Sequence, residues 1–161
     1  GIHIAVHAFA KITLFFCAGI ILMTLNTTKI SDMNGIGRKI PITMTAWLIS
    51  SFCIIGLPFT GGVWSKWYLA QGALDSGEPL MMAVILFGSV LAIFYLIPPV
   101  INAFFTPSLL DLNDENKLIL NKNETATSSL IAVTFTSTMC IALFFLIPQL
   151  VSWLSSIEGI G

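Results

Sequence analysis

Lys66 is the residue whose position most strongly suggests chemistry. Residues 40–65 contain no Asp, Glu, Lys, Arg or His, and Lys66 follows them directly, flanked by Trp64 and Trp67. Shortly before it, the apolar run contains four residues that disfavour a continuous helix: Gly56, Pro58, Gly61 and Gly62. An ionisable side chain beside a broken apolar helix is typical of an ion pathway.

A second group of titratable residues consists of His3, His7 and Lys11. On a helix, a spacing of four residues places these side chains on one face, with about 6 Å of rise between neighbours. A water molecule or a change of rotamer can bridge that gap. Because an imidazole changes its charge near neutral pH, three such groups in a row can pass a proton.

A lysine in apolar surroundings can adopt either protonation state. Neutralising a lysine at pH 7 costs about 4.6 kcal/mol, given its usual pKa near 10.4. Keeping it charged at the centre of a bilayer costs about 2.5–3.5 kcal/mol on insertion scales. Because these costs are similar, a nearby cation can favour the neutral form of Lys66 or Lys11, and its departure can restore the charge.

Each of these residues also has a structural interpretation. Lys66 can extend from the end of a half-helix to the lipid headgroups, with the neighbouring tryptophans in the interfacial layer. Lys11 has the same alternative, because its depth depends on where the first helix begins. For His3 and His7 the alternative is a hydrogen bond to a neighbouring carbonyl group. The sequence leaves these alternatives open.

The composition assigns the chain to the integral membrane proteins. Of its 161 residues, 56% are hydrophobic and 9% are charged, and the mean hydropathy is +0.92. A soluble domain carries roughly 25% charged residues, so this chain has too little polar surface for a water-soluble globule. The net charge of −1, without a basic stripe, excludes nucleic-acid binding.

The cysteines do not indicate a reactive or metal-binding site. Cys17, Cys53 and Cys140 each lie alone in an apolar run and form no CxxC pair. We therefore expect them to be small, buried hydrophobic residues. We also expect no cofactor, no metal site and no catalytic residue.

The lengths of the apolar runs predict an all-α membrane protein in which residues 1–161 form a single domain. A bilayer core near 30 Å thick requires about 20 helical residues. About four transmembrane helices result, over residues 2–25, 41–76, 79–105 and 128–155. As one helix, the second would be roughly 54 Å long, so the break at 56–62 must divide it into two half-helices. Pro98 and Pro99 should kink or end the third helix, and Pro148 should kink the fourth.

The charges of the loops predict an orientation in the membrane. Loops 26–40 and 106–127 contain all the loop lysines and arginines, which are Lys29, Arg38, Lys39, Lys117 and Lys122. The connection around residues 75–78 contains none. Because loops rich in Lys and Arg stay in the cytoplasm, we expect these two loops to be cytoplasmic. Both ends of the chain would then lie on the outer side of a cell (inner) membrane, in a multi-pass protein.

Several motifs of this sequence resemble a known family. They are HIAVHAFAK at 3–11, LFFCAG at 14–19, DMNGIGRKIP at 32–41, GLP at 56–58 and WSKWYL at 64–69. They are similar to the antiporter-like subunits shared by respiratory complex I, membrane-bound hydrogenases and the multisubunit (Mrp-type) sodium/proton antiporters. The forms SKWYL and HAFAK resemble most the D subunit of the Mrp-type antiporters. The resemblance is specific over residues 3–74 and only hydropathic beyond them.

This resemblance implies that the chain is the C-terminal part of a proton-translocating subunit. The terminal lysine of the family's lysine/histidine relay would be Lys66, and the inner members would be His3, His7 and Lys11. The expected partners are protons, sodium or another monovalent cation, the lipid bilayer and sister membrane subunits of a multisubunit complex. The paired glutamate and lysine that the family carries on earlier helices have no counterpart here, so the chain would hold half of a pathway.

Three functions remain open from the sequence. The first is a subunit of a monovalent cation/proton antiporter, and the second is a proton-pumping subunit of NADH-quinone oxidoreductase or of a hydrogenase. A third, of another class, is a truncated membrane scaffold that transports nothing. In the first two, any oxidoreductase activity would belong to the assembled complex, so we expect an ion-transport subunit and not an enzyme.

Overall fold

The computed structural model describes residues 1–25, 29–107 and 127–157, and every regular element within them is helical. The longer helices are α1 (Ile2–Leu25), α2 (Pro41–Ile55), α3 (Gly61–Asp75), α4 (Pro79–Phe105) and α6 (Thr127–Ile157). Two short 3-10 helices, η1 (Ile30–Met33) and η2 (Ile36–Arg38), connect α1 to α2. The predicted all-α class is confirmed. Lys117 and Lys122, on which the predicted orientation of loop 106–127 depends, lie outside the described residues.

Three of the described helices are long and apolar enough to cross a membrane, namely Ile2–Leu25, Pro79–Phe105 and Thr127–Leu154. The helices α2 and α3 have 15 residues each. At 1.5 Å of rise per residue, such a helix reaches about 22 Å, which is shorter than the bilayer core. Neither α2 nor α3 therefore spans a membrane alone, as expected for a span divided into two half-helices.

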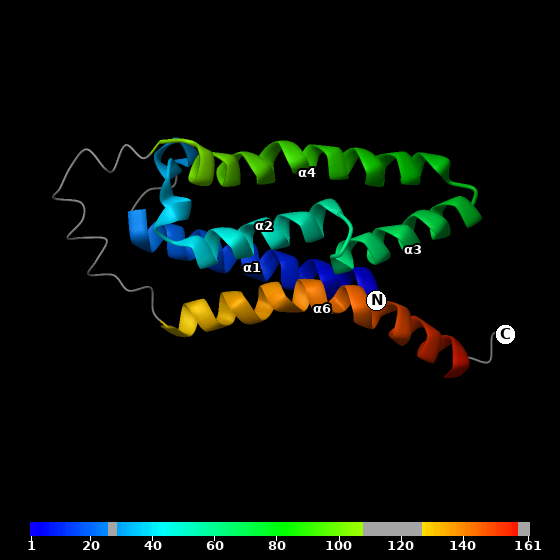
Figure 1. Ribbon diagram of the computed structural model, residues 1–161. Coiled ribbons are helices and arrows are strands. Elements are labelled where there is room, and N and C mark those ends of the chain that lie inside the picture. Colours follow the sequence, from blue (N-terminus) through cyan, green and yellow to red (C-terminus); the bar gives the residue numbers. More distant parts are fainter. Residues whose placement is uncertain (26–28, 108–126, 158–161) are drawn as a thin grey trace.

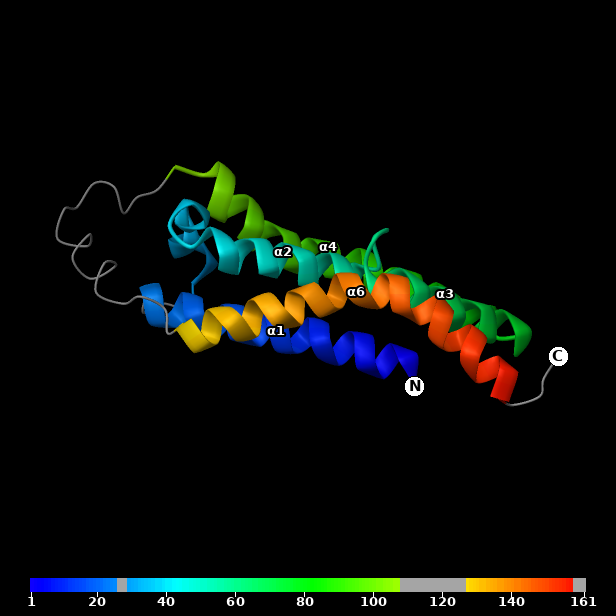
Figure 2. The same ribbon diagram turned by 60° about the horizontal axis from the view of Figure 1, so that its bottom comes forward.

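The helices run side by side along one long axis (Figure 1). The broken pair α2–α3 occupies the middle and contacts α4 on one side and α6 on the other. Helix α1 packs against α2, α3 and α6. Figure 2 shows α6 in front of α1 and α2 after the molecule is turned. The two half-helices thus pack against helices from both ends of the sequence, whereas Leu57, Pro58 and Phe59 of the break itself are exposed.

Small side chains fill the contacts between these helices. One core cluster joins α1, α2 and α6 around the break and consists of Val6, Ala10, Cys53, Cys140 and Ile147. A second joins α1, α2 and α6 farther along and consists of Cys17, Ile20, Ala46 and Val133. All three cysteines are buried, as predicted. Small residues let helices approach closely, which is how membrane helices commonly pack.

Prolines mark the ends and bends of the helices. Pro41 and Pro79 begin α2 and α4, where a missing N–H group costs nothing. Pro98 and Pro99 lie inside α4, which continues to Phe105, so they do not end this helix. Helix α6 contains Pro148 and changes direction over its C-terminal part (Figure 1).

The connection between α1 and α2 is docked on the C-terminal end of α4. Gly35 has a left-handed backbone, with φ of 73°, and its N–H group donates to the Asn102 carbonyl at 3.1 Å. Gly37 is buried against the same end, where an added Cβ would lie 2.8 Å from Phe104 Cδ1. This docking holds the basic segment of Arg38 and Lys39 at the end of the helix bundle.

Candidate functional site

The junction between α2 and α3 is the centre of the candidate site. Helix α2 ends at Ile55, and Gly56 caps it in a left-handed conformation with φ of 87°. The N–H groups of Gly56 and Leu57 both donate to the Phe52 carbonyl, at 2.9 and 3.0 Å. Because the last carbonyls of a helix have no N–H partner within it, the Ile55 carbonyl is available to other donors.

Helix α3 begins in direct contact with the end of α2. A Cβ on Gly62 would lie 1.8 Å from the carbonyl oxygen of Cys53, and one on Gly61 would lie 2.8 Å from Leu143 Cβ of α6. Both distances are shorter than real Cβ contacts. The two glycines named from the sequence therefore allow α3 to start against α2 and α6 at once.

Lys66 extends from α3 back to the end of α2. Its Nζ donates to the Ile55 carbonyl at 2.9 Å and also to Ser89 Oγ of α4. Its aliphatic stem lies over Gly56, where an added Cβ would be 2.9 Å from Lys66 Cδ. A cation at a helix C-terminus is stabilised by the free carbonyls and by the helix dipole. The broken helix thus provides a site for the charge of Lys66.

Ser89 is a site residue that we did not identify from the sequence. It lies in the middle of α4, and its Oγ donates to the Ile85 carbonyl at 3.0 Å. Its lone pairs can therefore accept an N–H group from Lys66. A signal existed, because Ser89 is the one polar side chain between residues 80 and 94. The sequence did not show that it faces Lys66.

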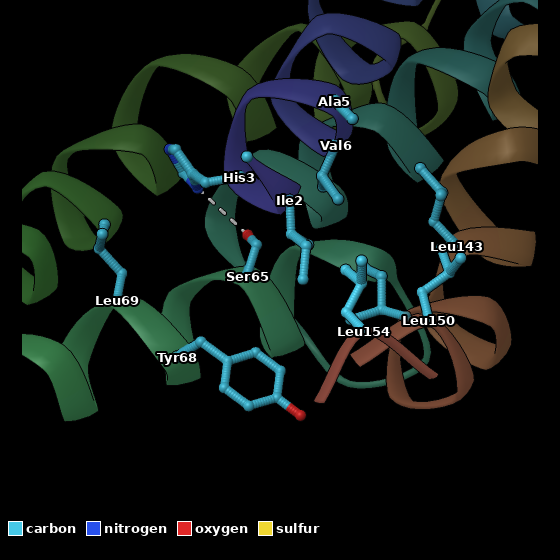
Figure 3. Close-up of a pocket in the computed structure, with 12 residues that line it drawn as sticks. Ile2, His3, Ala5, Val6, Ser65, Tyr68, Leu69, Leu143, Leu150 and Leu154 are labelled. Atoms are coloured by element: carbon cyan, nitrogen blue, oxygen red, sulfur yellow. Dashed lines mark hydrogen bonds between the residues drawn. The ribbon is translucent and has the colours of Figure 1, made fainter. Parts of the chain in front are cut away.

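The two histidines form a pair on α1. Their rings are stacked with centroids 5.5 Å apart and an interplanar angle of 22°. His3 Nδ1 lies 3.2 Å from Ser65 Oγ of α3 (Figure 3). Ser65 also donates to the Gly62 carbonyl at 3.1 Å. Since a hydroxyl has one proton, His3 must supply the N–H group whenever Ser65 donates to Gly62.

Ser65 and Lys66 are consecutive in α3, so their side chains reach different neighbours. Ser65 contacts α1, whereas Lys66 contacts α2 and α4. Ser65 contacts His3 of α1, and the ring of His3 stacks on that of His7. The structure therefore brings His3 and His7 close to the broken helix, with Ser65 as the direct link.

Lys11 lies one turn after His7 on α1. Its side chain is exposed. Within the part of the chain that the structure describes, Lys11 makes no hydrogen bond or ion pair to another helix. The structure does not join Lys11 to the break, and it joins His7 only through the ring of His3.

A cavity of about 590 Å³ lies beside the link between His3 and Ser65, between α1, α3 and α6 (Figure 3). Its other walls are mainly apolar and include Val6, Leu143 and Ile147. The polar side chains on its wall are His3, Ser65 and Tyr68. The polar contact between His3 and Ser65 forms its edge.

The chemistry available at this site is proton exchange. Imidazole, hydroxyl and amine groups can each accept or donate a proton or a hydrogen bond. No cluster of three or more His, Cys, Asp or Glu side chains that could hold a metal ion occurs among the described residues. The arrangement is two polar contacts on α3: Ser65 with His3 of α1, and Lys66 with the end of α2 and with Ser89 of α4.

Known proteins match the part of the chain that carries this site. Residues 1–92, more than half of the chain, match the family described as NADH:quinone oxidoreductase/Mrp antiporter, TM. NADH-quinone oxidoreductase subunit N from Desulforudis audaxviator is 38% identical over 103 residues, which cover 64% of this chain and 21% of the relative.

Two further relatives are longer proteins of the same kind. NADH-ubiquinone oxidoreductase chain 5 from Bos indicus is 31% identical over 126 residues, covering 74% of this chain and 21% of the relative. The chain 5 protein from Rhinoceros unicornis is 40% identical over 76 residues, or 47% of this chain and 12% of the relative. The chain thus spans only 21% of the length of the first two relatives. No solved structure matches it significantly.

Proposed function

Because this chain belongs to the NADH:quinone oxidoreductase/Mrp antiporter transmembrane family, we propose that it is part of a proton-translocating, antiporter-like membrane subunit. The observation that carries this proposal is the contact of Lys66 Nζ with the Ile55 carbonyl at the end of a broken membrane helix, at 2.9 Å. Discontinuous helices expose carbonyl groups inside a membrane, where they can hold a cation.

In this proposal the proton path includes His3, His7, Lys11 and Lys66. The stacked imidazoles lie one turn apart, and Ser65 connects His3 to the helix that carries Lys66. Protons move along the path by changes of protonation state and by rotation of the hydroxyl group. Lys66 is the end member, because its charge can be held at the break by carbonyl and hydroxyl oxygens.

Exchange of a proton for a metal cation could occur at the contact between Lys66 and the Ile55 carbonyl. A sodium ion or another monovalent cation binds to carbonyl oxygens, and the Ile55 carbonyl already accepts an N–H group from Lys66. A cation at this oxygen would compete with the ammonium group and favour release of its proton. The contact of Lys66 with the Ile55 carbonyl and the SKWYL and HAFAK forms of the motifs support a monovalent cation/proton antiporter.

A second candidate is a proton-pumping subunit of an NADH-quinone oxidoreductase. This candidate is favoured because the relatives are subunit N of an NADH-quinone oxidoreductase and chain 5 of an NADH-ubiquinone oxidoreductase. In either case we propose sister membrane subunits as partners, a multi-pass location in the cell (inner) membrane, and cytoplasmic loops 26–40 and 106–127.

Substitution of Lys66 in the complete, assembled protein tests the proposed function. Lys66→Arg keeps the charge but cannot release a proton, and Lys66→Gln removes the charge. If Lys66 only extends to the headgroups, Arg should replace it well. If it exchanges a proton in each cycle, both variants should lose most proton flux in proteoliposomes.

The matched control for these variants is Lys29, outside the proposed path. Lys29→Arg and Lys29→Gln should retain flux close to wild type. Wild-type flux in Lys66→Arg, measured at equal membrane abundance, would show that the charge is structural and would overturn the proposal.

A further inference from the structure

Ser89 of α4 is the side chain from another helix that contacts the Lys66 amine. We propose that Ser89 is a positioning residue that serves both protonation states of Lys66, as an acceptor for the ammonium form and as a donor to the neutral amine. This inference rests on the proposed function, because it concerns the same lysine.

The charged form uses Ser89 as an acceptor. An ammonium group has three N–H donors, and in the structure it donates to the Ile55 carbonyl and to Ser89 Oγ. Ser89 meanwhile donates its own proton to the Ile85 carbonyl at 3.0 Å, one turn back in α4. The hydroxyl is therefore already oriented with its lone pairs toward Lys66.

The neutral form needs a donor instead. An uncharged amine has a lone pair, and a buried lone pair without a partner costs free energy. The Ile55 carbonyl can only accept, so it cannot provide that donor. Rotation about the Cβ–Oγ bond of Ser89 moves its proton from the Ile85 carbonyl to the amine. The serine can thus follow the change of protonation state without a change of helix position.

The other groups around Lys66 do not replace this role. In the described part of the chain, no hydrogen bond joins the amine to His3 or His7 of α1 or to Cys53 of α2. Cys140 of α6 contacts Cys53. The acidic side chains of Asp75 and Glu78 are exposed at the connection of α3 and α4. Among the described residues, the direct partners of the amine are therefore one carbonyl and one hydroxyl group.

The decisive experiment compares the proton flux of the threonine and valine variants of Ser89, because these two side chains have the same shape. Ser89→Thr keeps the hydroxyl, whereas Ser89→Val has nearly the same volume without it. In the complete, assembled protein, Ser89→Val and Ser89→Ala should lower proton flux about tenfold, the size expected for a lost hydrogen bond to a charged group. Ser89→Thr should stay within about twofold of wild type on the same reasoning.

A matched control separates the lysine contact from the bond within the helix. Ser50 of α2 is buried and donates to the Ala46 carbonyl at 2.8 Å, one turn back in its own helix. Ser50→Ala removes this bond without touching Lys66 and should retain flux. All variants are compared at equal membrane abundance, so that a folding defect is not counted as a transport defect.

The outcomes distinguish this inference from the proposed function. Equal flux in Ser89→Thr and Ser89→Val would overturn the role of the hydroxyl. A loss of flux in Lys66→Gln together with wild-type flux in Ser89→Ala would overturn the inference about Ser89 alone. Wild-type flux in Lys66→Gln would overturn the proposed function itself.

Discussion

The α-carbon of Gly62 packs directly against the carbonyl oxygen of Cys53, so that a β-carbon at this position would lie 1.8 Å from that oxygen. Gly62 belongs to the first turn of α3, and Cys53 to the last turn of α2. The carbonyl oxygen of Cys53 is a backbone atom, so no change of side-chain rotamer can relieve the contact. The two half-helices can meet in this geometry only because residue 62 has no side chain.

We therefore expect Gly62→Ala to force α2 and α3 apart. Thermal stability in detergent and abundance in the membrane should both fall strongly. The matched control is Gly72→Ala in the same helix, where nothing lies within 4 Å of an added Cβ. That change should stabilise the protein by about 0.4–1 kcal/mol or leave it unchanged. Equal stability of the two variants would contradict the contact between the half-helices.

Gly56 and Gly77 form a second matched pair. Both have positive φ, 87° and 73°, so alanine at either position costs about 1–2 kcal/mol of backbone strain. Only at Gly56 does an added Cβ also meet Lys66, at 2.9 Å from Cδ. We expect both variants to lose stability, but only Gly56→Ala to lose proton flux as well. Similar flux in the two variants, after correction for abundance, would show that the stem of Lys66 need not lie over Gly56.

Ser65 should matter because it links His3 to α3. Ser65→Ala removes this link and should reduce flux about 3- to 10-fold, the range for one buried hydrogen bond. Ser51→Ala is the control, since Ser51 is also buried but donates only to its own helix, at the Trp47 carbonyl, 2.8 Å away. Flux is measured in proteoliposomes. If both serine variants behaved alike, the contact with His3 would have no role in transport.

Labelling with an impermeant thiol reagent can test the orientation. The native cysteines are buried and should react little. Ser31 and Ser76 are exposed, in the α1–α2 connection and after α3 respectively. We expect Ser76→Cys to be labelled from outside intact cells, and Ser31→Cys only after the membrane is opened. The reverse pattern would show that loop 26–40 faces outward.

The helices could be predicted from the sequence because the bilayer fixes the length of an apolar span. The break was predictable for the same reason, since residues 41–76 are too long for one crossing and contain Gly56 and Pro58 in the middle. The structure has α2 ending at Ile55 and α3 starting at Gly61, as this reasoning expects.

The partners of Lys66 could not be predicted in this way. Periodicity shows which residues share a face of one helix, but it does not show which face of α4 turns toward α3. The contact with Ser89 depends on that rotation, and the contact with Ile55 depends on the path of residues 56–60 through the break. The spacing placed Lys11 on the face of His3 and His7, and its side chain is exposed in the structure, so its role in a relay stays a prediction.

The division of one span into α2 and α3 has an electrical consequence. Lys66 contacts the C-terminal end of α2, at the break between the two half-helices. In a membrane its charge therefore lies partway through the electric field that the membrane potential creates. A full crossing of one charge corresponds to about 2.3 kcal/mol per 100 mV. For a charge halfway through the membrane, half of that is about a sevenfold change in occupancy, at about 1.4 kcal/mol per factor of ten. On the proposed function, a proton held by Lys66 at the break would respond to voltage as well as to pH, and its occupancy would change when the membrane is energised.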